Sequence, residues 1–81
     1  MIFTEKHRIT WQHDIHSSGG QTICYIEDKE AKTTFFASAF CSENDQYCKE
    51  TGRKISLTRA LKQTNFDKGQ RKEVWETYLN R

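Results

Sequence analysis

The chain has 81 residues, 35% of them hydrophobic, and its formal net charge is +2 at pH 7. This length predicts a single domain over residues 1–81, and because so small a core would gain from further buried surface, we expect a homo-oligomer. No apolar run approaches the roughly 20 residues of a membrane-spanning helix and no signal-peptide pattern opens the chain, so we expect no membrane partner and a cytoplasmic location.

The first half of the chain predicts antiparallel strands. Apolar and polar residues alternate over residues 7–15, and they alternate again over residues 21–27, after a Ser-Ser-Gly-Gly turn signal. The third strand is predicted at residues 32–41, where apolar groups on both faces are typical of a central or interface strand. Short connections favour a three-stranded meander, to which Met1–Thr4 could add a short edge strand.

The second half predicts two helices, over residues 43–62 and 68–80. Ser42 is a candidate cap for the first helix. Gly52 interrupts its apolar periodicity, so this glycine is either a break between two helices or a point of close packing. The fold class is therefore predicted to be α+β, with a three-stranded antiparallel β-meander followed by two α-helices.

The last helix carries both a start signal and an apolar stripe. Asp67 and Gln70 have the spacing of a capping box. The stripe consists of Val74, Trp75, Tyr78 and Leu79. Trp75 is predicted to be the core anchor of this helix, because a large buried ring contributes strongly to a small core.

Positive charge is concentrated in the second half of the chain. Residues 1–42 contain four Lys/Arg and five Asp/Glu, whereas residues 43–81 contain nine and six. The Arg guanidinium holds phosphate through two hydrogen bonds and Lys adds a mobile point charge. The candidate ligand-binding residues, for phosphate, another anion or an acidic partner, are Lys49, Arg53, Lys54, Arg59 and Lys62. If Gly52 opened a helix, the backbone amides that follow it would also face an anion. The alternative is a solvated helix face with Glu50 as an internal partner.

Three aromatic residues are candidates for stacking on nucleic-acid bases. Trp11, Tyr25 and Phe36 could do so if they lie on an exposed sheet face, although aromatic residues of a small domain more often form its core.

The cysteines and histidines give no metal motif. Cys24, Cys41 and Cys48 are odd in number and have no close pair, which indicates reduced thiols in a cytosol. A zinc site that combines cysteines with His13 and His16 remains an alternative, but we predict no metal and no cofactor.

No catalytic motif is present, so we predict that the protein is not an enzyme. The chain has no nucleophile elbow, no paired-carboxylate motif and no Gly-rich phosphate-binding loop. A small hydrolase with a general base among His7, His13 and His16 is an alternative.

Residues 45–61, DQYCKETGRKISLTRAL, and residues 71–79, RKEVWETYL, resemble segments of small uncharacterised bacteriophage proteins. Such proteins are often early host-takeover or counter-defence factors. The resemblance implies a non-enzymatic binding protein in the host cytosol that counteracts a host defence factor, either by binding a host protein or by sequestering a phosphorylated signalling nucleotide. The alternative is a small nucleic-acid-binding protein that uses the basic helix and the sheet aromatics. A sequence pI of about 8.5 argues against strong binding of DNA.

Overall fold

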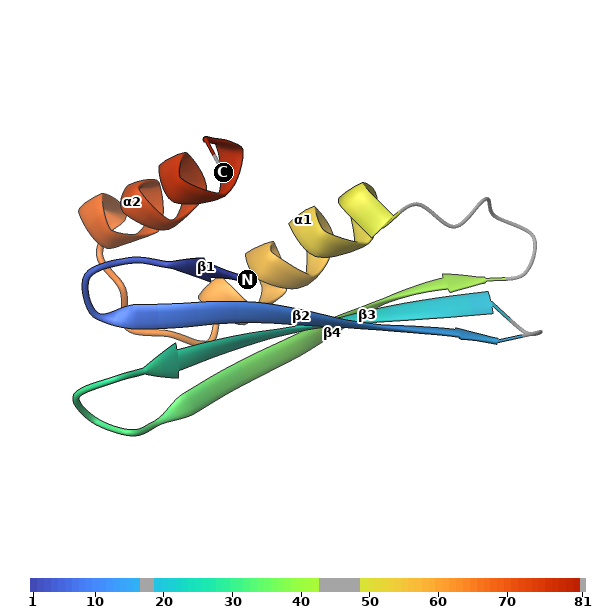
Figure 1. Cartoon of the computed structure of the whole chain (residues 1–81), viewed down its shortest axis with the longest axis horizontal. Coiled ribbons are helices and arrows are strands. Elements are labelled where there is room, and N and C mark those ends of the chain that lie inside the picture. The colour runs from blue at the N-terminus through green and yellow to red at the C-terminus, as the bar shows by residue number, and fades with distance from the viewer. Residues whose placement is uncertain (17–18, 43–48, 81) are drawn as a thin grey trace.

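The computed structural model describes residues 1–16, 19–42 and 49–80, with the backbone only at residues 15, 16, 41 and 42. Four strands are followed by two helices: β1 (Ile2–Phe3), β2 (His7–His16), β3 (Gly19–Asp28), β4 (Thr34–Ser42), α1 (Lys49–Leu61) and α2 (Lys68–Leu79). The strands form one antiparallel sheet in the order β1-β2-β3-β4, and both helices lie on the same face of it (Figure 1). No helix of the described part is long and apolar enough to cross a lipid bilayer.

The predicted α+β class is confirmed, but the prediction of three strands is wrong because the sheet has four. The fourth is β1, an edge strand within Met1–Thr4, for which the sequence suggests a short edge strand; Ile2 pairs with Ile9 and Phe3 pairs with Arg8. A strand of two residues is too short to show alternation, so periodicity alone could not establish it. Its turn into β2 is closed by hydrogen bonds between Thr4 and His7, from backbone to backbone at 2.9 Å and from His7 N to Thr4 Oγ1 at 3.2 Å.

The two faces of the sheet have different roles. Ile9, Cys24 and Ile26 are fully buried on the face that the helices cover. They form one core with residues of both helices, which are Leu57, Ala60, Leu61, Val74 and Tyr78. No helix covers the opposite face (Figure 1). On this face of β4, Phe36 is 60% exposed and Phe40 is 62% exposed.

Gly52 is a point of close packing rather than a helix break. α1 runs through it without interruption. A Cβ atom added at Gly52 would lie 2.5 Å from Thr22 Oγ1 and 3.0 Å from Thr22 Cβ, so α1 sits on β3 closer than any side chain would permit. The backbone amides after Gly52 lie beyond the first turn of α1, where intrahelical hydrogen bonds engage them, and the anion site predicted there is not formed. Residues 43–48, predicted to be helical, and the side chain of Ser42 lie outside the described part.

The start of α2 is confirmed and its predicted anchor is corrected. Asp67 Oδ1 accepts from Gln70 N at 2.8 Å, and Gln70 Oε1 accepts from Asp67 N at 3.1 Å, which completes the capping box. Tyr78 is fully buried, whereas Trp75 is only half-buried and Leu79 is 63% exposed. The buried strip of α2 is narrower than the apolar stripe in its sequence, so Tyr78 takes the place predicted for Trp75.

The thiol of Cys24 is expected to resist alkylation. Burial raises its pKa to about 12, and the nucleophile in alkylation is the thiolate. Native protein treated with iodoacetamide at pH 8 should therefore yield an unmodified Cys24 peptide by mass spectrometry, and protein unfolded in urea should yield a modified one. Rapid labelling of Cys24 in the native protein would contradict its place in the core.

Candidate ligand-binding site

The five cations predicted to bind a ligand do not form one site. Lys49 and Lys62 mark the two ends of α1, so they lie about 20 Å apart along its axis. Between them, Arg53 and Lys54 share a partner, and Arg59 points to the sheet edge, where its Nη1 donates to Ser38 O at 2.9 Å. One small ligand could not contact all five.

Glu50 forms ion pairs with two of these cations, Arg53 and Lys54. Arg53 Nη2 donates to Glu50 Oε2 at 2.8 Å, and Lys54 Nζ lies 3.9 Å from Glu50 Oε1. Tyr78 of α2 donates its hydroxyl to Glu50 Oε1 at 2.9 Å, which joins the two helices. The hydrogen bond to Glu50, followed by that with Tyr78, raises the pKa of Arg53. The single carboxylate of Glu50 thus compensates part of the charge of Arg53 and Lys54.

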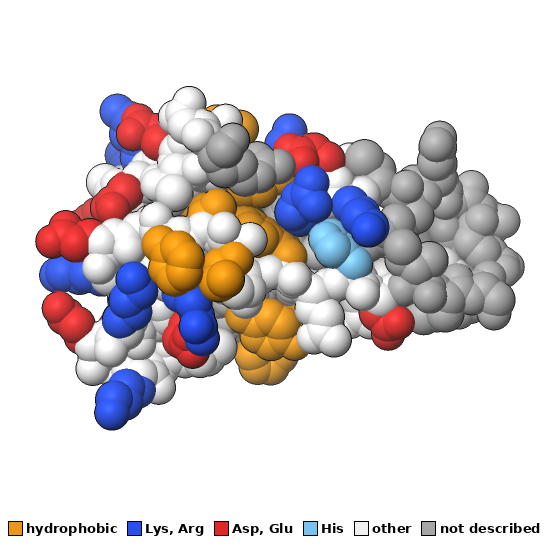
Figure 2. All heavy atoms as spheres, viewed as in Figure 1, with side chains coloured by type: hydrophobic (Ala, Val, Ile, Leu, Met, Phe, Trp, Pro, Cys, Tyr) orange, Lys and Arg blue, Asp and Glu red, His pale blue; other side chains and the backbone are white. Residues whose placement is uncertain are grey.

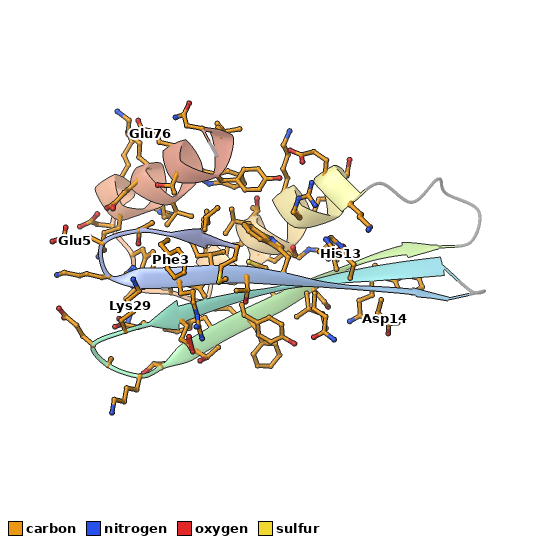
Figure 3. The ribbon with its side chains drawn as sticks, in the orientation of Figure 1. Phe3, Glu5, His13, Asp14, Lys29 and Glu76 are labelled. Atoms are coloured by element: carbon orange, nitrogen blue, oxygen red, sulfur yellow. The ribbon has the colours of Figure 1, made fainter. Side chains whose placement is uncertain are left out.

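His13 lies close enough to Lys49 and Arg53 of α1 for their charges to act on it, and the three form a basic cluster at the start of that helix. Figure 2 shows a histidine beside Lys or Arg side chains on this face, and Figure 3 labels His13. His13 Nδ1 lies 2.9 Å from Thr22 Oγ1. Burial lowers the pKa of His13, and the positive charges of Arg53 and then Lys49 lower it further. The sequence did not indicate this cluster, because His13 lies on a distant strand and comes next to α1 only in the folded chain.

His13 is expected to titrate below the ordinary histidine pKa of about 6.5. Because its pKa is lower in the folded than in the unfolded protein, its contribution to stability is complete above pH 6.5 and is lost as the pH falls through the folded pKa. An NMR titration of the imidazole protons should give this lowered pKa. Lys49→Ala should raise it only in part, since burial is the larger cause, and Lys62→Ala, at the far end of α1, should leave it unchanged. A pKa at or above 6.5 in the parent protein would contradict the cluster.

A second group of cations lines a hollow of about 160 Å³ between α1 and α2. Its wall consists of Thr58, Leu61, Lys62, Arg71 and Trp75. Within residues 1–16, 19–42 and 49–80, neither Lys62 nor Arg71 makes an ion pair. Arg71 was not among the predicted residues, because it belongs to the other helix and only the packing of the helices brings it to Lys62.

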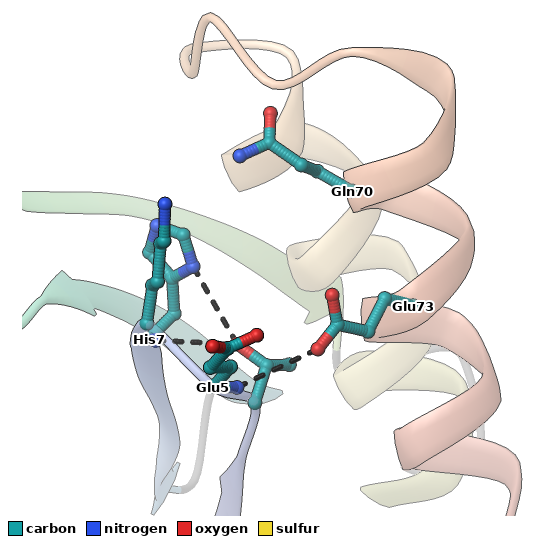
Figure 4. A pocket seen from close by; sticks show the side chains of 6 residues that line it. Glu5, His7, Gln70 and Glu73 are labelled. Carbon is teal, nitrogen blue, oxygen red and sulfur yellow. Dashed lines mark hydrogen bonds between the residues drawn. The ribbon is translucent and has the colours of Figure 1, made fainter.

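A larger hollow of about 200 Å³ lies between the β1–β2 turn and α2, and Glu5, His7, Gln70 and Glu73 contribute to its wall (Figure 4). Two carboxylates, of Glu5 and Glu73, line it against one cation, Lys6, so its charge does not favour an anion. The His7 ring packs on Phe66 with their centroids 4.3 Å apart. His7 therefore packs the sheet against the segment before α2, which contains Phe66.

The three predicted stacking residues are divided between the two faces of the sheet. Trp11 lies on the covered face, where its Nε1 donates to Arg53 O at 3.2 Å and its ring centroid is 5.4 Å from that of Tyr78. Tyr25 and Phe36 lie together on the open face, with ring centroids 6.2 Å apart.

Few charged residues flank those rings on the open face. Arg8 is the one cation that β2, β3 and β4 carry there among the described residues, and it forms an ion pair with Glu27. This face therefore provides rings without the free positive charge that a nucleic-acid backbone requires.

The described residues contain no group of three His, Cys, Asp or Glu side chains that could hold a metal ion. The side chains of His16, Cys41 and Cys48 lie outside what the structure describes, so the zinc alternative is not decided for them.

A comparison of the chain with protein-family models, with curated proteins and with solved structures finds no match. The resemblance to small bacteriophage proteins therefore stays a prediction, and the functional argument depends on the site itself.

Proposed function

We propose that this chain is a small non-enzymatic binding protein whose partner is phosphorylated and is held by cations of α1. One observation carries the proposal: cations gather at both ends of α1, while Glu50 is the only acid in that helix. Lys49 and Arg53 lie beside His13 at one end, and Lys62, directly after α1, meets Arg71 at the other. Lys and Arg are the side chains that bind phosphate best.

A phosphorylated small molecule is favoured over nucleic acid as the partner. The open sheet face has two neighbouring rings, tilted by 34°, but its Arg8 is paired with Glu27. In contrast, Lys49, Lys62 and Arg71 lie on or directly beside the helices. Rings and cations thus do not combine into the continuous groove that single-stranded nucleic acid needs. If the resemblance to phage proteins holds, the ligand would be a host signalling nucleotide that the protein sequesters in the host cytosol.

The hydrolase alternative has one geometric candidate, the series Thr4, His7 and Asp28. His7 Nδ1 lies 3.5 Å from Thr4 Oγ1, and His7 Nε2 lies 3.5 Å from Asp28 Oδ2, both longer than a good hydrogen bond. Thr4 Oγ1 already accepts from His7 N, and Asp28 Oδ1 accepts from the amides of Glu30 and Ala31. These side chains close two turns, which supports a structural role.

Native mass spectrometry of protein purified from bacteria tests the proposed function. We expect a fraction of the protein to retain a phosphorylated small molecule, and we expect this fraction to fall as salt rises, because exposed charges are screened. The same spectrum reports the predicted homo-oligomer. A retained polypeptide would support the host-protein alternative. If nothing is retained and ATP shifts no NMR signal of α1 at low salt, the proposed function is wrong.

A further inference from the structure

The hollow between the helices is formed by the end of α1 and the start of α2, and hydrogen bonds fix both. At the end of α1, Lys62 N donates to Thr58 O at 3.3 Å, and Thr64 Oγ1 donates to Leu61 O at 2.7 Å. At the start of α2, the capping box of Asp67 and Gln70 fixes the first turn. These hydrogen bonds fix the backbone of Lys62 and of Arg71 on either side of the hollow. The closeness of the two cations is therefore a fixed feature of the fold.

The hollow has a charged side and an apolar side. Lys62 and Arg71 supply two positive charges that have no acidic partner in the described part of the chain. Two like charges on one small concavity repel each other, and an anion between them would remove that cost. Thr58 Oγ1 already donates to Lys54 O at 2.9 Å, so toward a ligand its hydroxyl can only accept.

The apolar side consists of Leu61 and Trp75. Leu61 is buried, whereas Trp75 is half-buried and leaves part of its indole at the hollow. Tyr78 meets the indole edge-on, with the ring planes at 90° and the centroids 5.9 Å apart, and is itself held by Glu50. Arg71 and Trp75 are four residues apart on one helix, so their side chains share a face. A ring that stacks on Trp75 would thus have its substituent near Arg71.

We propose that the hollow between α1 and α2 binds a phosphate monoester that carries an aromatic ring, a nucleoside monophosphate being the simplest. Lys62 and Arg71 hold the phosphate, and Trp75 packs against the ring. This inference rests on the proposed function and assigns the phosphorylated ligand to this hollow. The volume of about 160 Å³ is below the roughly 300–1,000 Å³ of most ligand pockets, which favours a mononucleotide partly in solvent over a dinucleotide.

The probe for this proposal is 5′-AMP, titrated at low salt into isotope-labelled protein and followed by NMR. We expect the indole signal of Trp75 and the amides of Lys62 and Arg71 to shift together. Adenosine lacks the phosphate and inorganic phosphate lacks the ring, so each should bind at least tenfold more weakly than AMP. If phosphate binds as tightly as AMP, the ring contributes nothing and the proposed ligand class is wrong.

A pair of double variants separates the site from general charge. Lys62→Ala with Arg71→Ala should weaken AMP binding at least tenfold. Lys68→Ala with Lys72→Ala removes the same charge from α2, outside the hollow, and should weaken it less than twofold. Equal weakening by both pairs would overturn the site. AMP shifts confined to His13, Lys49 and Arg53 would overturn this assignment while leaving the proposed function intact.

Discussion

Tyr78→Ala is expected to lower the free energy of unfolding by about 3–5 kcal/mol, the usual cost of removing a large buried aromatic side chain. Tyr78 is fully buried, contacts the rings of Trp11 and Trp75, and donates its hydroxyl to Glu50 of α1. At about 0.05–0.15 kcal/mol per residue, a domain of 81 residues has about 4–12 kcal/mol of stability, so the variant should lose a large share of it. Urea denaturation followed by circular dichroism measures the effect.

Two neighbouring substitutions serve as controls for Tyr78→Ala. Tyr78→Phe keeps the ring and removes the hydroxyl that hydrogen-bonds with Glu50 and Arg53, so its cost should be about 1–2 kcal/mol. Leu79→Ala truncates the adjacent residue, which is 63% exposed, and should change stability by less than about 0.5 kcal/mol. If Leu79→Ala proves as damaging as Tyr78→Ala, α2 is rotated relative to the arrangement described above.

Gly52→Ala is expected to destabilise the protein by about 1–3 kcal/mol, the usual cost of overpacking. In an ordinary helix interior the same change would stabilise by about 1 kcal/mol, because alanine is the better helix former. Here the new methyl group would lie 2.5 Å from Thr22 Oγ1 and 3.0 Å from Thr22 Cβ. Both atoms belong to the Thr22 side chain, but Cβ is fixed by the backbone of β3, a central strand, so α1 must move away from β3. The urea midpoint should fall accordingly.

The chain contains a matched glycine for this experiment. Gly69 lies in α2, and a Cβ atom there would meet only Asp67 Oδ1, at 3.4 Å. Gly69→Ala should therefore be neutral or stabilising by up to about 1 kcal/mol. In addition, Gly52→Ala should cost less in a Thr22→Ala background, which removes the closest atom. A stabilising Gly52→Ala would show that the close approach of α1 to β3 does not exist.

The sequence predicted those parts of the fold that depend on local periodicity. The alternation in residues 7–15 and 21–27 placed β2 and β3 to within two residues at their ends. It did not reveal which face of the sheet is covered, because apolar groups lie on both faces of β4. Only the packing of α1 on β3 and β4 shows that Phe36 is outside while Ala39 is buried.

The burial of individual side chains and their tertiary neighbours were harder to predict than the helices and strands. The apolar stripe of α2 predicted the correct side of the helix, yet Tyr78 is the fully buried residue, while Trp75 is partly buried and packs against the core. The cations of α1 were identified from their number. Their partners come from other parts of the chain, such as His13 on β2 and Arg71 on α2. No helical spacing could reveal such tertiary neighbours.

The contact between Arg59 and Ser38 bears on the solubility of the protein. β4 is an edge strand of nine residues without a charge or a proline, a composition that invites strand-to-strand aggregation. In an antiparallel pair every second residue turns its amide and carbonyl away from its neighbour. Ser38 is such a residue, since Arg59 of α1 reaches its carbonyl at 2.9 Å. The guanidinium thus places a positive charge at the middle of the open edge of β4, which has no charge of its own. This charge opposes the pairing of another extended chain with β4.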